Sequence, residues 1–385
     1  MDATAPALAA TAKRYRLGTH RTCTPEATWE RIAELLPLAG VTRVADLTRL
    51  DRVGIPVFQA VRPASRNLAV SQGKGATPAA ARVSAAMEAL ELWHAECLDA
   101  LPQTAVSLRE MRSANALPLR DLRWHPGVRP LDAVPIRWIE AEPLGGGEPI
   151  WLPRQMLELD FRLPDAFEVL LFVKTSSGLA SGNCRAEAVL HGLCELVERH
   201  GLARFLRDRS TAVPIAPESV ADESCRELIG RCRATGARLA LWDATWEAGV
   251  PTLIAEFVLP DLPSSWRGAG CHPAPEVALS RALTEAAQSR LTYISGARDD
   301  LIFEADEADN EADRVWQGFV EHPEGRRFSE VASLATESVD DDLAQVLSRL
   351  GSLGLTACAV DLTRPGIGLP VFFVYVPGLL EPSHD

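Results

Sequence analysis

Short apolar segments, rich in β-branched and aromatic residues, alternate along this chain with turns built from Gly, Asp and Thr. This pattern predicts antiparallel hairpins rather than helices. In three places the hairpin carries the same order of residues, an Asp-x-Thr segment followed by Gly-x-Pro. The three copies start at Asp46, Asp243 and Asp361, and their glycines are Gly54, Gly249 and Gly368. One copy would be ordinary turn chemistry, but three copies indicate an internal repeat.

A helix is predicted after two of these hairpins. Pro78 and Pro275 each open a long run without further Pro or Gly, and Pro is favoured in the first turn of a helix. The motif Asp lies 42 residues before a glutamate in both units, since 88 − 46 and 285 − 243 are equal. A third helix is predicted from Arg185 to Arg199, although the hairpin motif is missing before it.

Each of the three predicted helices carries polar residues at positions i, i+4 and i+7, which lie on one face of a helix. The triplets are Ser84, Glu88 and Glu91, then His191, Glu195 and Glu198, then Arg281, Glu285 and Gln288. They could belong to solvent-exposed faces. Their neighbours are mainly Ala, Val and Leu, however, and helices that are apolar around most of their circumference are usually buried.

Buried carboxylates are unfavourable unless a cation meets them. The triplets hold five glutamates, and Glu187 lies one turn before His191. Oxygen ligands of this kind suit Mg²⁺, which also binds the phosphates of a substrate. Zinc is less consistent with the sequence because the pattern His-Glu-x-x-His is absent. For His191 itself, a hydrogen-bonded buried histidine is the alternative to metal binding.

The segment from Ser71 to Thr77 precedes the first helix and contains Lys74 between two glycines. We predict a flexible loop there, whose backbone and ammonium group contact phosphate at the N-terminus of the helix. The loop lacks the spacing of a Walker A motif. Ser181-Gly182-Asn183 and Gly268-Ala269-Gly270 stand before the other two helices, and we expect the same type of turn there.

The composition excludes several classes of partner. The chain has 385 residues and a net charge of −13 at pH 7, whereas nucleic acids and anionic membranes bind clustered Lys and Arg. We find no targeting or transmembrane segment and expect a cytoplasmic protein. The eight cysteines lack Cys-x-x-Cys spacing and are expected to be reduced, mostly in the core. An acidic stretch at 299–313 is predicted to be a solvated connector, and 331–350 a helix.

Together these elements predict an α+β fold, in which hairpin-rich β-sheets carry packed helices and internal pseudo-repeats surround a nucleotide pocket. We expect an N-terminal appendage at 1–38 and one main domain at 39–385. Within that domain the pseudo-repeats are expected near 41–97, 170–208 and 238–298, with a C-terminal hairpin near 355–378.

Several segments, taken in their order, resemble the signature blocks of the YcaO family. They are Ser71-Gln-Gly-Lys74-Gly75, Ser84-x-x-x-Glu88, Ala180-Ser-Gly-Asn183, Glu195-x-x-Glu198-Arg199, Arg281 to Thr292, Gly18-Thr-His-Arg21, Arg43 to Pro56 and Gly296 to Asp300. The resemblance spans most of the chain and implies a YcaO-type fold, with 39–385 as the catalytic domain. It implies ATP and Mg²⁺ as cofactors, a peptide or protein as substrate, and phosphorylation of a backbone amide oxygen.

The triplets, the predicted loop and the resemblance together assign the site residues. Nucleotide binding is expected at Lys74, Ser84, Glu88, Asn183, His191, Arg199, Arg281, Glu285, Gln288 and Arg290. Metal binding is expected at Glu88, Glu91, Glu187, Glu195 and Glu198. No residue is identified as a sulfur nucleophile or another catalytic group.

The blocks at Gly18–Arg21 and Asp46–Pro56 resemble most closely the YcaO proteins that are associated with TfuA and form thioamides. We therefore expect a thioamide product and a TfuA-like partner protein. Azoline formation, amidine formation and a non-catalytic nucleotide-binding scaffold are the alternatives. A homodimer is also considered, whereas neither nucleic acid nor a membrane is expected as a partner.

Overall fold

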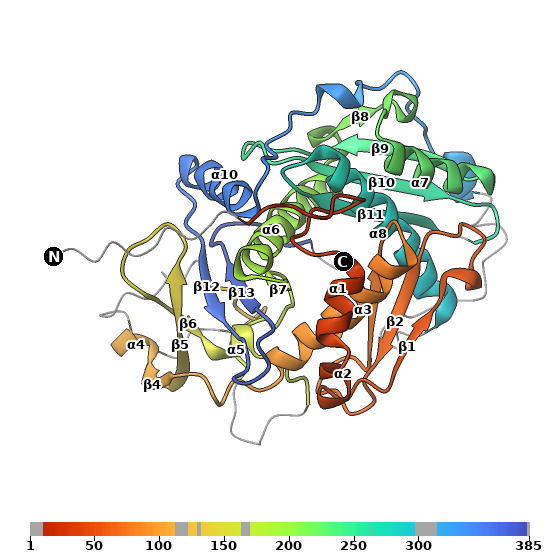
Figure 1. The fold of residues 1–385 in the computed structure, drawn as a ribbon. Coiled ribbons are helices and arrows are strands. Elements are labelled where there is room, and N and C mark those ends of the chain that lie inside the picture. The colour runs from red at the N-terminus through yellow and green to blue at the C-terminus, as the bar shows by residue number, and fades with distance from the viewer. Residues whose placement is uncertain are drawn as a thin grey trace.

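The computed structural model describes residues 11–111, 122–128, 132–162, 170–262, 264–296 and 314–382. In these ranges antiparallel strands form three sheets and helices pack against them (Figure 1), which confirms the predicted α+β class. The predicted acidic connector at 299–313 lies outside the described residues.

Two repeat units have the predicted order of hairpin, third strand and helix. The first contains β1 (Arg43–Asp46), β2 (Val57–Val61), β3 (Val70–Lys74) and α3 (Pro78–Ala95). The second contains β9 (Arg238–Asp243), β10 (Thr252–Val258), β11 (Ser265–Cys271) and α8 (Pro275–Ser295). In both units the third strand pairs with the second strand of the hairpin, and the helix packs back onto that third strand.

The third unit combines segments that are far apart in the sequence. It is built from β7 (Leu179–Ser181), α6 (Arg185–Arg207), β12 (Cys358–Asp361) and β13 (Val371–Tyr375). Strand β13 pairs with β7, and α6 packs on both strands (Figure 1). The C-terminal segment therefore supplies the hairpin that is missing before α6 in the sequence.

All three Asp-x-Thr segments form the same turn. The Asp carboxylate accepts a hydrogen bond from the backbone N–H of the motif Thr, at 2.9, 3.0 and 2.8 Å for Thr48, Thr245 and Thr363. The Thr hydroxyl then accepts one from the first residue of the returning strand. The glycine of Gly-x-Pro has φ of 70°, 67° and 67°, which glycine adopts without steric cost. These contacts confirm the three predicted hairpins and explain the shared motif as turn chemistry.

The prediction of a flexible loop from Ser71 to Thr77 is wrong, because most of this segment is strand β3. Gly73 lies where the strand touches α3, and a Cβ atom on it would be 1.9 Å from the backbone nitrogen of Ala85. On β11, a Cβ atom on Gly270 would be 2.0 Å from the carbonyl oxygen of Ala278. These glycines therefore allow a strand to pack closely on its helix.

A six-stranded sheet extends the third unit. It contains β4 (Gln103–Ser107), β5 (Pro135–Pro143) and β6 (Ile150–Pro153), with α4 (Leu108–Met111) and α5 (Arg154–Leu157) nearby. The sheet of the second unit ends at β8 (Val213–Ile215), and α7 (Glu223–Ala234) packs beside α8.

Helix α10 (Val339–Ser352) begins later than the predicted helix at 331–350. The Ser338 hydroxyl accepts a hydrogen bond from the backbone N–H of Asp341, so Ser338 caps the helix. At the other end of the chain, α1 (Pro25–Ile32) packs on α3, and α2 (Leu35–Leu38) follows it. The domain boundary at residue 38 stays a prediction.

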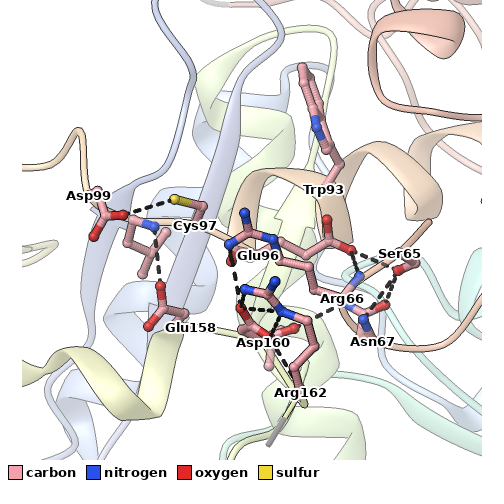
Figure 2. A network of polar contacts seen from close by, with 12 residues as sticks. Ser65, Arg66, Asn67, Trp93, Glu96, Cys97, Asp99, Glu158, Asp160 and Arg162 are labelled. Carbon is pink, nitrogen blue, oxygen red and sulfur yellow. Dashed lines mark hydrogen bonds and ion pairs between the residues drawn. The ribbon is translucent and has the colours of Figure 1, made fainter. Parts of the chain in front are cut away.

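Polar contacts hold the C-terminal end of α3 against the turn between β2 and β3 (Figure 2). Glu96 follows the helix and accepts hydrogen bonds from the Ser65 hydroxyl at 2.7 Å and the Arg66 N–H at 3.0 Å. Its other oxygen binds Arg62 at 2.8 Å. Asp160 adds an ion pair to Arg66. This network fixes the orientation of the helix that carries the first polar triplet.

Five of the eight cysteines are buried, in agreement with the predicted place of most of them in the core, and their reduced state stays a prediction. Within the described parts of the chain, each helix is too short or too polar to cross a bilayer.

Candidate functional site

The helices of the three units enclose a cavity of about 570 Å³. Each of α3, α6 and α8 presents its predicted polar triplet to this cavity. Of the predicted site residues, all but one line it: Lys74, Ser84, Glu88, Glu91, Asn183, Glu187, His191, Glu195, Glu198, Arg199, Arg281, Glu285 and Gln288. The polar faces of three separate helices therefore meet at one place.

Small side chains allow these helices to present polar faces while they stay packed in the core. On α3, Ala85 and Ala89 are fully buried behind the triplet. On α8, Ala282 and Ala286 are buried in the same way. The backbone of each helix can therefore lie directly on its sheet, and its longer polar side chains extend to the opposite side.

Arg290 is the predicted site residue that does not line the cavity. Its guanidinium binds Asp51 at 3.0 Å and Asp261 at 2.6 Å, and only 2% of the residue is exposed. An arginine that is bonded to two carboxylates has few donors left for a phosphate. Arg290 thus ties α8 to the segments around Asp51 and Asp261. Its position two residues after Gln288 turns it to another face of the helix.

Two carboxylates of the cavity meet too little positive charge. Glu91 accepts hydrogen bonds from the N–H and the hydroxyl of Ser181 at 2.8 and 2.6 Å. Burial, with Glu88 and Glu195 nearby, nevertheless raises the pKa of Glu91 to about 8. Burial also raises the pKa of Glu198 to about 7, although Arg281 lies 3.7 Å away and the Cys271 N–H donates to it at 3.0 Å.

The negative charges of two other glutamates, Glu285 and Glu195, are better compensated by neighbouring cations and hydrogen-bond donors. Lys74 binds Glu285 at 2.6 Å, and although burial alone raises the pKa of Glu285, Lys74 and Arg281 lower it overall. Glu195 accepts hydrogen bonds from Arg199 at 3.2 Å and from the Gly178 N–H at 3.1 Å. The cations of the site are therefore already placed among its carboxylates.

Glu187 has four protein donors. Its Oε1 atom accepts hydrogen bonds from the N–H and the hydroxyl of Thr22, both at 2.5 Å. Its Oε2 atom accepts them from the N–H and the side-chain amide of Asn183, at 2.9 and 3.1 Å. Burial alone raises the pKa of Glu187, but Arg21 and these hydrogen bonds lower it overall. Glu187 thus joins the N-terminal segment to the start of α6, and its role as a metal ligand stays a prediction.

The N-terminal segment contributes cavity residues that the sequence analysis did not assign. Arg21, Cys23 and Thr28 line the cavity. Arg21 also lies 3.0 Å from Nδ1 of His191, whose pKa is lowered well below its usual value by burial and by Arg281 and Arg21. The Gly-Thr-His-Arg block ending at Arg21 was a signal for these residues, but the sequence could not show that it lies beside α6.

Comparison with known proteins identifies the family. A family model described as YcaO cyclodehydratase, ATP- and Mg²⁺-binding, matches residues 72–380. The chain belongs to the YcaO family. The predicted cofactors, ATP and Mg²⁺, agree with this description.

Several uncharacterized proteins are similar to this chain over most of its length. An uncharacterized protein of Methanothermobacter thermautotrophicus is 36% identical over 94% of this chain and 95% of its own length. A Rhizobium leguminosarum bv. trifolii protein described as lying in the tfuA 3′ region is 36% identical, over 93% of this chain and 88% of its own. Two uncharacterized Mycobacterium tuberculosis proteins are 41% identical over 74% of this chain, which spans 65% of their length.

Solved structures share the fold. YcaO from Methanopyrus kandleri, bound with AMPPCP and Mg²⁺, is 26% identical with a TM-score of 0.75, over 96% of this chain and 94% of that one. A heterocyclase in complex with substrate and cofactor has a TM-score of 0.79 and 22% identity, over 97% of this chain and 54% of that one.

The chemistry of the residues that line this cavity suits a magnesium-bound nucleotide. Glu91 and Glu198 have raised pKa values because burial deprives their charges of solvent, and a divalent cation would favour their ionised forms. Among the described residues, the buried Nε atom of Arg281 has no hydrogen-bond partner. The glutamates of the cavity offer only oxygen atoms as metal ligands, and oxygen is the ligand atom that Mg²⁺ prefers.

Proposed function

We propose that this chain uses ATP and Mg²⁺ to phosphorylate a backbone amide oxygen of a peptide or protein, and that the product is a thioamide formed with a TfuA-type partner. The observation that carries the proposal is the convergence of three polar helix faces in one cavity, with glutamates and cations side by side. The relative encoded in a tfuA region supports the thioamide product and the partner.

Five glutamates are the proposed metal ligands, with Glu187 the least accessible of them because of its four protein donors. They are Glu88, Glu91, Glu187, Glu195 and Glu198. These carboxylates would hold Mg²⁺, which when bound would supply the positive charge that neutralises the phosphates.

Lys74, Arg199 and Arg281 are the proposed phosphate contacts among the cavity cations. Phosphoryl transfer depends mainly on positioning and on neutralising the charge of the transferred group. The carboxylates that now hold these cations would share them with the phosphates. Ser84, Asn183, His191 and Gln288 line the same cavity and would orient the nucleotide.

The proposed reaction balances in two steps. The amide oxygen attacks the γ-phosphorus, ADP leaves and the amide nitrogen loses its proton, which gives an O-phosphorylated imidate. Hydrogen sulfide ion (HS⁻) then adds to the former carbonyl carbon, phosphate leaves with the oxygen, and the proton of the sulfide passes to the nitrogen, which gives the thioamide. Neither step changes the oxidation state of the peptide.

Azoline formation is the second candidate, because the family is described as cyclodehydratase and a heterocyclase shares the fold. A Cys, Ser or Thr side chain of the substrate would then replace the external sulfur donor. Amidine formation would use the same activated amide with an amine. A non-catalytic scaffold is less consistent with the glutamates and cations of the cavity.

The test measures two quantities, the Mg²⁺-dependent turnover of ATP and the mass of the peptide product. Both are measured with a candidate peptide, in the presence and in the absence of a TfuA-type partner. We expect substrate-dependent turnover that is lost in Glu88→Ala, and a mass gain equal to the exchange of oxygen for sulfur. Glu247→Ala, at an exposed site, is the matched control. Loss of one water from the product would favour azoline formation, and absence of nucleotide binding would reject the proposed enzyme.

A further inference from the structure

The N-terminal hairpin, defined here as Ala12–Thr22, forms one wall of the cavity. Tyr15 and Arg21 exchange two backbone hydrogen bonds, of 3.0 and 2.9 Å, across it. Its tip, Leu17 to Thr19, lines the cavity. A Cβ atom on Gly18 would be 2.8 Å from Ala76 and 2.9 Å from the Ser280 hydroxyl. The tip is therefore inserted between the starts of α3 and α8.

The first strand of the N-terminal hairpin is fixed by a buried ion pair. Nζ of Lys13 lies 2.5 Å from Oδ2 of Asp342 on α10, and both side chains are 0% exposed. Lys13 also donates a hydrogen bond to the carbonyl oxygen of Thr336 at 2.7 Å. The other oxygen of Asp342 accepts hydrogen bonds from the N–H and the hydroxyl of Thr336. Neither Lys13 nor Asp342 lines the cavity.

The second strand is fixed to α6. Thr22 donates two hydrogen bonds to Glu187, and Arg21 contacts His191. Figure 1 shows the red N-terminal segment passing from the side of α10 to α1, in front of α6. The ion pair and the Thr22 contacts therefore hold the two ends of the N-terminal hairpin, and its tip lies against the cavity and the starts of α3 and α8.

The surroundings of the ion pair resemble a metal site. His20, His272 and Asp342 are all buried, and their ligand atoms lie within 4.8 Å of one another. Two features oppose a metal there. The Lys13 ammonium already stands at the Asp342 carboxylate, and the Ala274 N–H donates to Nδ1 of His272 at 2.9 Å. The cluster thus contains its own cation in the form of Lys13.

We propose that Lys13 and Asp342 are positioning residues for nucleotide binding, which they affect by holding the N-terminal hairpin against the cavity. The inference rests on the proposed nucleotide site. Removing one member of a buried ion pair leaves an uncompensated charge, whereas removing both does not. A shift of the first strand toward water would solvate that charge and would move the tip away from the starts of α3 and α8.

The test compares dissociation constants for Mg²⁺ with a non-hydrolysable ATP analogue. We expect Lys13→Met to raise the constant by about tenfold or more, since the Asp342 charge loses its partner. The double variant Lys13→Met/Asp342→Asn should bind within about threefold of the wild type, because Asn keeps the oxygen that Thr336 contacts. Arg233→Ala removes an exposed ion pair to Glu218, outside the N-terminal hairpin, and should leave binding unchanged.

The binding experiment distinguishes failure of the proposed function from failure of the positioning role. Wild-type protein that fails to bind the analogue would reject the proposed function. Normal wild-type binding with a folded but unaltered Lys13→Met variant would reject the positioning role alone. The same role predicts that ATP turnover in this variant shows a raised KM with little change in kcat, which a general loss of folded protein would not produce.

A measurement on the wild type covers the case in which Lys13→Met does not fold. Saturating analogue should slow tryptic cleavage after Arg14, Arg16 and Arg21, and leave cleavage after the exposed Arg327 unchanged. Cleavage rates that are the same with and without the analogue at all four sites would contradict the inference. So would about one equivalent of bound zinc whose removal abolishes nucleotide binding, because the cluster would then be a metal site.

Discussion

Single residues of one chemical type have different tasks in this cavity, and their donors decide which. Glu187 meets four donors and its pKa is lowered. Glu198 meets one backbone donor and a more distant Arg281, and burial raises its pKa to about 7. A carboxylate with four protein donors fixes geometry and would have to give up a donor to bind a metal, whereas one with an unmet charge is suited to a metal directly.

Replacement of Glu198 by Gln tests this distinction. The variant keeps the shape of the side chain and removes a charge that burial disfavours. We expect folding stability equal to or above that of the wild type, and nucleotide-dependent turnover reduced by about 100-fold or more. Thermal unfolding and steady-state turnover measure the two quantities. Glu247→Gln, at an exposed site, is the control, and a stable, fully active Glu198→Gln variant would contradict the metal role.

His94, on the same helix as Glu91 but outside the cavity lining, provides a pH prediction. It is buried, and its ring lies 2.7 Å from the carbonyl oxygen of Leu90. Burial lowers the pKa of His94 to about 4 in the folded protein. The unfolded chain has a histidine pKa near 6.5 and binds more protons between these values, so stability falls as the pH drops from about 6.5 to 4.

His94→Gln should remove this part of the pH dependence. Between pH 7 and pH 4 the wild type should lose at most about 3 kcal/mol more unfolding free energy than the variant. Denaturant unfolding at a series of pH values measures the difference. Parallel curves for the two proteins would show that His94 is not the responsible group.

At the scale of the element, the contact between a glycine strand and its helix recurs in two units. Gly73 on β3 faces α3, and Gly270 on β11 faces α8. The close contact brings each helix directly onto its sheet, so that the polar triplet on its far face reaches the common cavity. The glycines that looked like a phosphate loop in the sequence therefore position the site from behind.

Gly73→Ala tests this arrangement. The added methyl would overlap the backbone of Ala85 and force β3 and α3 apart, at a cost of about 3 kcal/mol or more. Gly230→Ala on α7 is the matched control, because a Cβ atom there meets no neighbour within 4 Å among the described residues. That change should stabilise the protein by about 0.5–1 kcal/mol. Denaturant unfolding of both variants measures the contrast, and similar values would contradict it.

At the scale of the whole molecule, the third wall of the cavity depends on residues from both ends of the described chain. Helix α6 carries the second triplet, and Val374 of β13 packs against it with no exposed surface. The N-terminal hairpin then covers the same helix through Thr22. The site is complete only when the N-terminal hairpin and β13 are both packed around α6.

Val374→Ala should therefore weaken the site from a distance. We expect a loss of about 2 kcal/mol in unfolding free energy, because a buried side chain is truncated. Val213→Ala is the control at a half-exposed position and should change stability by less than about 0.5 kcal/mol. Thermal unfolding measures the stability of both variants, and its repetition with Mg²⁺ and nucleotide measures how far the weakened site still binds. Equal stability of the two variants would argue against α6 relying on β13.

The sequence alone was sufficient for the hairpins and the polar faces, because both are local. An Asp-x-Thr turn is closed by hydrogen bonds within a few residues, and residues at i, i+4 and i+7 share a helix face whatever surrounds them. It was insufficient for Arg290, whose partners Asp51 and Asp261 are distant in the chain. The role predicted for Gly73 was also wrong, because the sequence does not distinguish a glycine that gives flexibility from one that allows close packing.

The chain's own sequence thus determined which elements form and which residues each element presents. Only the tertiary structure decided how the units combine: β12 and β13 complete the unit of α6, and the N-terminal hairpin closes the cavity through Lys13 and Thr22. The physical reason is the distance along the sequence over which each interaction acts. Backbone turns and helix periodicity act between near neighbours, whereas pairing of strands and burial of an ion pair join residues hundreds of positions apart, and no local pattern specifies such partners.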